Sequence, residues 1–273
     1  MEMFMMTTLN RPSPADLLQD IAASACAARA AQVRMLARMA CLALILAAMG
    51  GKASGDELRE VVYTTTPETL KGYLCRPAGA GPFPAVAYNH GGVGDIIGGA
   101  PKETCEALAA AGFVGFAPIR RKTRSTAGHP EDVQAGLDYL LGLDYVDRQR
   151  VAITGFSRGG ALTFMAAARG APAKAAVIMA SAVPPPQSGF KFEDAAKIRI
   201  PVLLLVAEND TGSRKTMGQD TFDSMRRMSA ALTAAGNPSK LIVYPPYGSD
   251  GHEMFFEIGA YWKDVVEFLK KHL

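Results

Sequence analysis

Cysteine, histidine and tryptophan are scarce in this sequence. Its 273 residues include 4 cysteines, 4 histidines and 1 tryptophan. Cys26, Cys41, Cys75 and Cys105 form neither a CxxC pair nor a Cys/His cluster of the kind that holds zinc. We therefore expect no metal site, and nothing indicates a cofactor. Cys75 and Cys105 alone fall in the predicted folded region, and two readings stay open for them: a single disulfide in an exported protein, or two buried thiols.

A strong charge of one sign is also missing. The formal net charge is +3 at pH 7, because 29 Lys and Arg residues are interspersed with 26 Asp and Glu residues. No basic block is long enough to follow a phosphate backbone, so nucleic acid is not an expected partner. With 49% hydrophobic and 20% charged residues, the chain is typical of a globular enzyme that buries one large core.

The N-terminal region contains an apolar run at 40–49, which is shorter than the roughly 18 residues of a membrane-spanning helix. Arg34 and Arg38 precede this run, and small residues follow it up to Gly55. That order is typical of a secretory signal peptide. We predict a leader over 1–55 with its signal-like segment at 34–55.

Cleavage of this leader after Gly50 or Gly55 would fit the preference for small residues. We expect an exported protein, periplasmic or secreted, with no permanent membrane span. Two alternatives stay open: a cytoplasmic protein, and an Ala-rich helix over 16–49 that packs on the domain.

From about residue 60 onward, short apolar or β-branched runs alternate with stretches of helical period. This alternation predicts a single α/β domain over 56–273 with a mostly parallel sheet. Each of the first four predicted helices is followed by a glycine, which favours a left-handed cap. The predicted strands are 60–65, 71–76, 84–89, 113–117, 150–154, 175–180, 201–206 and 241–244, and the predicted helices are 101–111, 131–141, 158–169, 215–235 and 253–271.

The run Gly155-Phe156-Ser157-Arg158-Gly159 lies between an apolar strand and a predicted helix. In the GxSxG nucleophile elbow, the two glycines leave room for a sharp strand-to-helix turn that presents the serine hydroxyl above the sheet. The motif fixes only three positions, so its context between strand and helix carries the argument. We predict Ser157 as a catalytic nucleophile.

A serine hydroxyl needs an imidazole base and a carboxylate that orients the imidazole, and in this fold both follow the serine in the chain. Asp210 follows the apolar strand 201–206, at the sheet edge where ligands bind, while Glu208 lies closer to the strand. His252 stands in a loop after the last strand. His90 and His129 precede the serine and His272 is at the chain end, so we predict Asp210 and His252 as the acid and the base. Asp250 is expected to be a loop or capping residue.

The remaining part of the predicted site is an oxyanion hole, which needs backbone N–H groups close to the substrate carbonyl. Asn89-His90-Gly91-Gly92 follows an apolar strand directly. We predict donors from Gly91, Gly92 and the amide of Arg158, with His90 supporting the loop. Arg120, Arg121 and Arg124 could grip an acidic substrate group, but an exposed or ion-paired structural role is favoured.

From residue 60 to the C-terminus the sequence resembles the dienelactone-hydrolase-like branch of the α/β hydrolases, as a serine-nucleophile member. The residues behind this resemblance are 89–92, the elbow at 151–160, Asp210 and Gly251-His252. The resemblance implies an α/β-hydrolase fold with an eight-stranded sheet, no separate lid domain and no cofactor. The sequence departs from the eponymous enzymes in two ways: they use cysteine where Ser157 stands, and no glutamate after Gly92 matches the one that primes their thiol.

These observations predict serine-dependent hydrolysis of small-molecule carboxylic esters or lactones through an acyl-enzyme intermediate. Residues 132–160 also resemble the catalytic domain of prolyl-oligopeptidase-type peptidases, but those carry a propeller domain, which is not seen before residue 60. A serine peptidase acting on short peptides therefore ranks second. A catalytically silent binding protein ranks third, because the triad is complete. The segment 181–199 is too short for a lid domain, which favours small substrates over long-chain lipids.

Overall fold

The computed structural model describes residues 58–273. The description below concerns these residues alone. The predicted leader, with its signal-like segment, lies outside the described residues.

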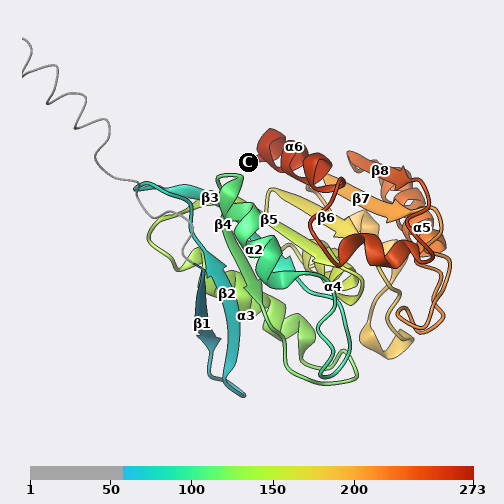
Figure 1. The fold of residues 1–273 in the computed structure, drawn as a ribbon, viewed down its shortest axis with the longest axis horizontal. Helices are drawn as coiled ribbons and strands as arrows, with labels where there is room; N and C mark the ends of the chain where they lie inside the picture. Colours follow the sequence, from blue (N-terminus) through green and yellow to red (C-terminus); the bar gives the residue numbers. More distant parts are fainter. Residues whose placement is uncertain (1–57) are drawn as a thin grey trace, which may run out of the picture. The chain divides into compact units, whose positions relative to one another are not determined.

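In the described part of the chain, eight strands form one sheet with the order β1-β2-β4-β3-β5-β6-β7-β8 (Figure 1). The pairs β1–β2 and β2–β4 are antiparallel, and the other neighbours are parallel. The predicted fold class, a mostly parallel eight-stranded α/β-hydrolase sheet, is confirmed. The strands are β1 (Arg59–Thr64), β2 (Leu70–Cys75), β3 (Phe83–Asn89), β4 (Val114–Pro118), β5 (Val146–Phe156), β6 (Ala175–Met179), β7 (Val202–Ala207) and β8 (Ser239–Tyr244).

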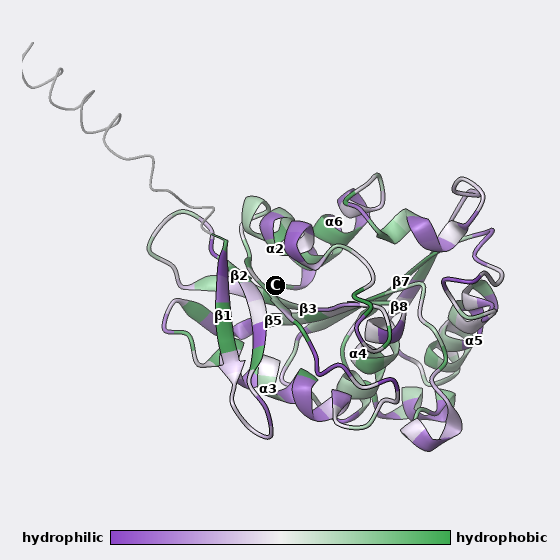
Figure 2. Cartoon of the chain, turned by 60° about the horizontal axis from the view of Figure 1, so that its bottom comes forward, coloured by the Kyte–Doolittle hydropathy of each residue, from purple (hydrophilic) through white to green (hydrophobic). Residues whose placement is uncertain are grey.

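Helices cover both faces of this sheet. One hydrophobic cluster contains the apolar faces of α3 (His129–Leu141), α4 (Arg158–Ala168) and α5 (Thr221–Ala234). The other contains those of α2 (Pro101–Ala110) and α6 (Trp262–His272). Figure 2 shows the apolar strands between these two layers of helices. Because both faces are covered, β6 and β7 are buried along their whole length, which explains their continuous apolar sequences.

Three of the predicted helices agree with the structure to within two residues at each end, and the other two differ more. The helix predicted for 215–235 begins at Thr221, because Met217 and Gly218 have left-handed backbone (φ 55° and 78°). The Asp220 side chain then accepts a 2.8 Å hydrogen bond from the Asp223 amide and caps the helix. The helix predicted for 253–271 is instead a 3-10 helix, η3 (Gly251–Phe255), followed by a separate α6.

The glycines predicted to close four helices have left-handed backbone at three of the four positions. Gly112, Gly170 and Gly236 have φ of 96°, 79° and 69°. Gly142 keeps right-handed backbone, with φ −77°, so the expectation for this glycine was wrong. The α3 terminus is satisfied instead by the Gly142 amide, which donates to the carbonyls of Asp138 and Tyr139.

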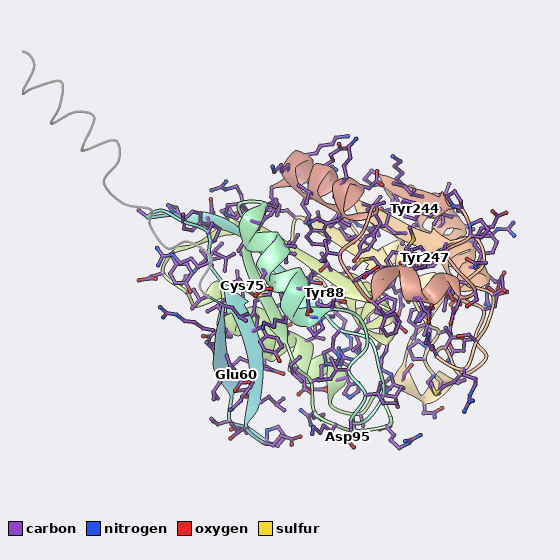
Figure 3. The ribbon with its side chains drawn as sticks, in the orientation of Figure 1. Glu60, Cys75, Tyr88, Asp95, Tyr244 and Tyr247 are labelled. Atoms are coloured by element: carbon purple, nitrogen blue, oxygen red, sulfur yellow. A yellow bond between two sulfur atoms is a disulfide. The ribbon has the colours of Figure 1, made fainter. Side chains whose placement is uncertain are left out.

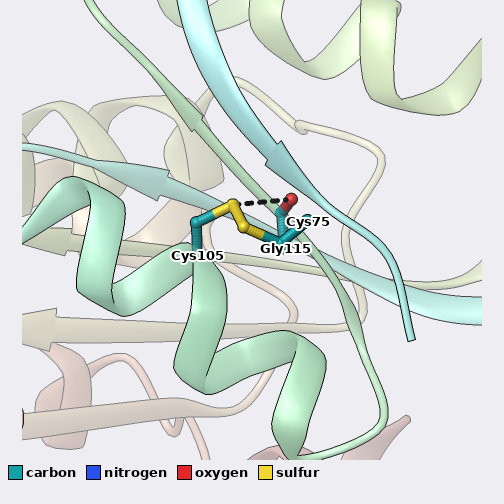
Figure 4. Close-up of a disulfide and its surroundings, with 3 residues drawn as sticks. All are labelled: Cys75, Cys105 and Gly115. Atoms are coloured by element: carbon teal, nitrogen blue, oxygen red, sulfur yellow. Dashed lines mark hydrogen bonds between the residues drawn. A yellow bond between two sulfur atoms is a disulfide. The ribbon is translucent and has the colours of Figure 1, made fainter. Parts of the chain in front are cut away.

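A disulfide between Cys75 and Cys105 joins the end of β2 to α2, so the structure selects this alternative over two free thiols (Figure 4). The two Cα atoms are 5.6 Å apart and both residues are buried. The bridge closes a loop of 30 positions that contains β3. The bridge therefore links α2 covalently to the end of β2.

The opposite end of the sheet is tied to α6 by a hydrogen bond. The hydroxyl of Tyr244, which is labelled in Figure 3 at the end of β8, donates to the Asp264 carboxylate over 2.6 Å. Between β6 and β7 the chain forms only the short 3-10 helices η1 (Pro186–Ser188) and η2 (Phe192–Lys197). Among residues 58–273 there is thus no separate lid domain, and no helix there has the length and apolar character to cross a membrane.

Candidate active site

Ser157 lies at a sharp turn between the last residue of β5 and the first residue of α4. Its backbone has φ 53° and ψ −119°, a strained conformation for a residue with a side chain. A Cβ atom at Gly155 would collide with the Gly159 carbonyl and with Thr163, and one at Gly159 would collide with the Asn89 carbonyl. The spacing of the GxSxG motif follows directly from these close approaches.

The end of β6 holds the backbone of Ser157 from both sides. The Ser157 amide donates to the Met179 carbonyl over 2.9 Å, and the Ala182 amide donates to the Ser157 carbonyl over 3.3 Å. Between these two contacts, Ala180 has left-handed backbone with φ 42°. The strained backbone of Ser157 is therefore fixed by main-chain contacts that do not involve its hydroxyl.

The structure brings Ser157, Asp210 and His252 together. Nε2 of His252 lies 3.1 Å from Ser157 Oγ, and Nδ1 lies 2.8 Å from Asp210 Oδ2. All three side chains are buried. The two contacts have the geometry in which one ring nitrogen accepts a hydroxyl proton while the other donates to a carboxylate.

Several local features place Asp210 and His252. Gly251 is needed because a Cβ there would collide with the Asp210 amide. Asp250 caps η3 by accepting a 3.0 Å hydrogen bond from the His252 amide, so its expected capping role is confirmed. Glu208, the competing acid, is exposed and makes no hydrogen bond to His252.

Phe156, which sequence reasoning passed over, supports the imidazole from the side. Its ring centroid lies 4.6 Å from that of His252, and Phe256 packs edge-on against Phe156. Such contacts hold an aromatic ring in one orientation. The only signal for this role in the sequence is the place of Phe156 directly before the nucleophile.

The loop after β3 differs in one respect from the prediction. The Gly91 amide donates to the Gly98 carbonyl over 2.9 Å, so it is already engaged and the expected oxyanion role of Gly91 is not available to it. Gly92 and Val93 line the cavity beside Ser157, and their amides have no partner among the described residues. The Arg158 amide is in the first turn of α4, where amides lack partners within the helix. Gly92, Val93 and Arg158 are thus the candidate donors, and Val93 was missed.

The arginines near the site have three different roles. Arg121 forms a salt bridge with Asp132 of α3 over 2.5 Å, which agrees with the expected ion-paired structural role. Arg120 is buried and donates to the His90 carbonyl over 2.7 Å, and burial together with the charge of Arg158 lowers the pKa of Arg120 to about 10. Arg124 is exposed and lines the cavity beside Ser157.

Two cavities meet at Ser157. The larger has a volume of about 510 Å³ and includes His252 in its wall, together with Arg124, Arg214 and Lys215. The smaller has a volume of about 90 Å³ and is lined in part by Ala182, Val183, Pro184 and Pro185. Neither wall contains a carboxylate. Ser157 is thus reachable from a cavity of the size that binds small molecules, and two arginines and a lysine paired with Glu253 lie in its wall.

A sheet of this order, with the GxSxG turn at Ser157 after β5, Asp210 after β7 and His252 after β8, has the α/β-hydrolase architecture. The model of the dienelactone hydrolase family matches residues 119–250. This match includes Ser157 and Asp210, and it ends two positions before His252. The resemblance to the dienelactone-hydrolase-like branch of the α/β-hydrolase superfamily is confirmed.

Relatives of known sequence agree with this assignment. A protein of Methylorubrum extorquens described as "Putative carboxymethylenebutenolidase" is 28% identical over 226 residues, covering 73% of this chain and 74% of that protein. A Salmonella typhi protein of the same description is 28% identical over 240 residues, covering 75% and 84%. These matches support a hydrolase.

Solved structures share the fold at lower identity. Thermogutta terrifontis esterase 2, phosphorylated by paraoxon, is 19% identical with a TM-score of 0.62, and the match covers 81% of this chain and 94% of that one. Pyrococcus horikoshii acylaminoacyl peptidase is 18% identical with a TM-score of 0.66, covering 81% of this chain. This chain spans only 42% of that peptidase.

Proposed function

We propose that the protein is a serine esterase that hydrolyses small carboxylic esters or lactones through an acyl-enzyme intermediate. The observation that carries the proposal is the chain of contacts from Asp210 through His252 to Ser157 at the strained elbow. The family match and the esterase fold add support. Export is part of the proposal, supported by the signal-like sequence and by the Cys75–Cys105 disulfide, since disulfides persist in oxidising compartments.

The first half-reaction forms the acyl-enzyme. His252 Nε2 takes the proton of Ser157 Oγ as the oxygen attacks the ester carbonyl carbon, and Asp210 stabilises the imidazolium through Nδ1–H. The negative charge that develops on the carbonyl oxygen is stabilised by the amides of Arg158 and of Gly92 or Val93, each worth about 3–4 kcal/mol. The intermediate collapses as His252 gives its proton to the alcohol oxygen, which leaves.

The second half-reaction repeats these steps with water. His252 takes a proton from a water molecule, whose oxygen attacks the acyl carbon. Collapse returns the proton to Ser157 Oγ and releases the carboxylic acid. Over the two half-reactions one water is consumed, one alcohol and one carboxylic acid are released, and the three side chains return to their starting protonation states.

The test compares aryl esters of several acyl lengths, a small lactone and aminoacyl anilides, with Ser157→Ala as the control. Hydrolysis of esters or lactones that is lost in Ser157→Ala supports the proposal. Preferred cleavage of the anilides would assign the protein to the serine peptidases instead. Absence of any turnover that depends on Ser157 would favour a binding protein.

A second measurement tests export. After expression with its full N-terminus in a bacterial host, the protein should be recovered outside the cytoplasm, with a new N-terminus close to residue 51 or 56. Recovery from the cytoplasm with the leader retained would reject this part of the proposal.

A further inference from the structure

The two cavities that meet at Ser157 differ in size by more than fivefold. Their volumes are about 90 Å³ and about 510 Å³. Five residues line both cavities: Gly92, Val93, Ser157, Lys215 and Met217. An ester bound at Ser157 has two parts, acyl and alcohol, that extend in different directions from the reacting carbonyl. Each cavity can therefore receive one part.

The position of His252 decides which part goes where. His252 lines the larger cavity and is absent from the wall of the smaller one. The alcohol oxygen must receive its proton from His252 Nε2, and the water that replaces the alcohol must give a proton to the same atom. The alcohol therefore leaves through the larger cavity, and the acyl group stays on Ser157 in the smaller one.

The smaller cavity has little room to expand. Pro184 and Pro185 are in its wall, and their ring-locked φ angles limit movement of that segment. The Val183 amide donates to Gln219 Oε1 over 2.9 Å, which ties this segment to the loop before α5. At about 90 Å³, the smaller cavity offers less than a fifth of the space of the larger one, which has about 510 Å³.

The larger cavity has an open apolar rim. Ile96, Met217 and Phe256 line it with exposed fractions of 69%, 60% and 40%. Exposed apolar side chains that line one cavity together form a patch of the kind that marks ligand-binding grooves. Met217 also has left-handed backbone, so the loop holds this side chain at the cavity despite the strain.

We propose that the substrate is an ester of a short acyl group with a bulkier alcohol, whose apolar part contacts the rim of the larger cavity. This inference rests on the proposed esterase function and specifies its substrate class. Val183 and Pro184 limit the acyl group, and the rim of Ile96, Met217 and Phe256 receives the alcohol.

The test uses two series of esters. In the first, the alcohol is 4-nitrophenol and the acyl group lengthens from acetyl through butyryl to hexanoyl and octanoyl. In the second, the acyl group is acetyl and the alcohol grows from phenol to 1-naphthol and 4-phenylphenol, whose acidities are similar. We expect kcat/KM to fall at least tenfold between butyryl and hexanoyl, because one misfitting methylene changes kcat/KM by about 10- to 200-fold. Along the second series, kcat/KM should stay level or rise as the alcohol grows.

A pair of variants tests the assignment of each cavity. Val183→Ala enlarges the smaller cavity and should raise the hexanoyl-to-acetyl ratio of kcat/KM about tenfold, with the naphthyl-to-phenyl ratio unchanged. Ile96→Ala, an exposed and matched truncation of the other wall, should lower the naphthyl-to-phenyl ratio and leave the acyl ratio unchanged. Thermal unfolding of both variants verifies that they are folded.

Different failures are distinguishable. Ester hydrolysis that depends on Ser157 but prefers long acyl groups, or that ignores acyl length, overturns this inference and leaves the esterase proposal intact. Variant effects on the opposite ratio would also overturn it. Absence of Ser157-dependent turnover in both series would overturn the esterase function itself and this inference with it.

Discussion

The backbone amide of Arg120 donates a 3.2 Å hydrogen bond to Nε2 of His90. Since Nε2 accepts, the ring proton is on Nδ1, which donates to the Gly91 carbonyl over 2.6 Å. Burial and the nearby charge of Arg120 hold the pKa of His90 well below its usual range, so the ring stays neutral. The loop that carries Gly92 and Val93 is thereby fixed to the loop after β4.

Replacing His90 with alanine should release this loop and lower kcat about 10- to 100-fold with a smaller effect on KM, because a displacement of about 1 Å in a catalytic group costs that much. His272→Ala, at the chain end, is the matched control and should leave both constants unchanged. The measurement is steady-state hydrolysis of an aryl acetate. An unaltered kcat in His90→Ala would show that the loop keeps its position without the ring.

Asp210 and Glu208 provide a direct comparison of two acids on one strand end. Asp210→Asn keeps the size of the side chain but removes the charge that orients His252, so kcat should fall about 10⁴-fold. Glu208 is exposed, and Glu208→Gln should change kcat less than twofold. Comparable losses in the two variants would contradict the role proposed for Asp210.

Two buried histidines should make stability depend on pH. Burial, together with the charges of Arg120 and Arg158, lowers the pKa of His129 to about 4, and the pKa of His90 is also lowered. Both groups bind more protons in the unfolded state than in the folded state between about pH 6.5 and 4. The contribution of these two neutral histidines to the free energy of unfolding is thus fully present above about pH 6.5. It should be lost as the pH falls through this window.

The measurement for this prediction is the midpoint of urea unfolding at pH 7.5, 6, 5 and 4.5. The midpoint should decrease steadily below pH 6.5 in the native protein. His129→Gln, whose side chain does not titrate, should show a shallower decrease over the same range. Identical slopes in the two proteins would exclude His129 as a source of the effect.

Removing the Cys75–Cys105 disulfide should destabilise the protein. For a loop of 30 positions, the entropy of closing the unfolded chain predicts a loss of about 3–4 kcal/mol in the free energy of unfolding. Denaturant unfolding with and without a reductant measures it, and the double variant Cys75→Ala, Cys105→Ala should no longer respond to the reductant. A native protein with equal stability in both conditions would be inconsistent with a bridge in solution.

Arg124 should favour negatively charged esters. It lines the larger cavity and has no ion pair with a described residue, and its carbonyl accepts a 2.8 Å hydrogen bond from Arg158, which fixes its backbone. Arg124→Gln should reduce the ratio of kcat/KM for a carboxylate-bearing aryl acetate to that for a neutral one severalfold, more strongly at low salt. Lys122→Gln, whose amine is exposed and paired with Asp95 (labelled in Figure 3), is the control with an unchanged ratio.

The eight strands and the spacing of the elbow could be predicted because they depend on neighbours in sequence. Buried strands between two helical layers require continuous apolar runs, and the turn at Ser157 requires glycine at 155 and 159 for any L-residue chain. The order of Asp210 and His252 after the serine follows from the order of the strands. These features were within reach of the sequence alone.

Other features depend on contacts between distant segments, and only the tertiary structure decided them. The amide of Gly91 is engaged by Gly98 because the loop folds back on itself, and the last predicted helix is divided because η3 must place His252 against Ser157, 95 positions earlier in the chain. The sequence by itself determined which residues could react and on which edge of the sheet they lie. Tertiary packing decided which backbone amides are free, how the two cavities divide the space around Ser157, and that Cys75 meets Cys105. Each of these features depends on distances between chain segments that are far apart in the sequence, and no local pattern contains those distances.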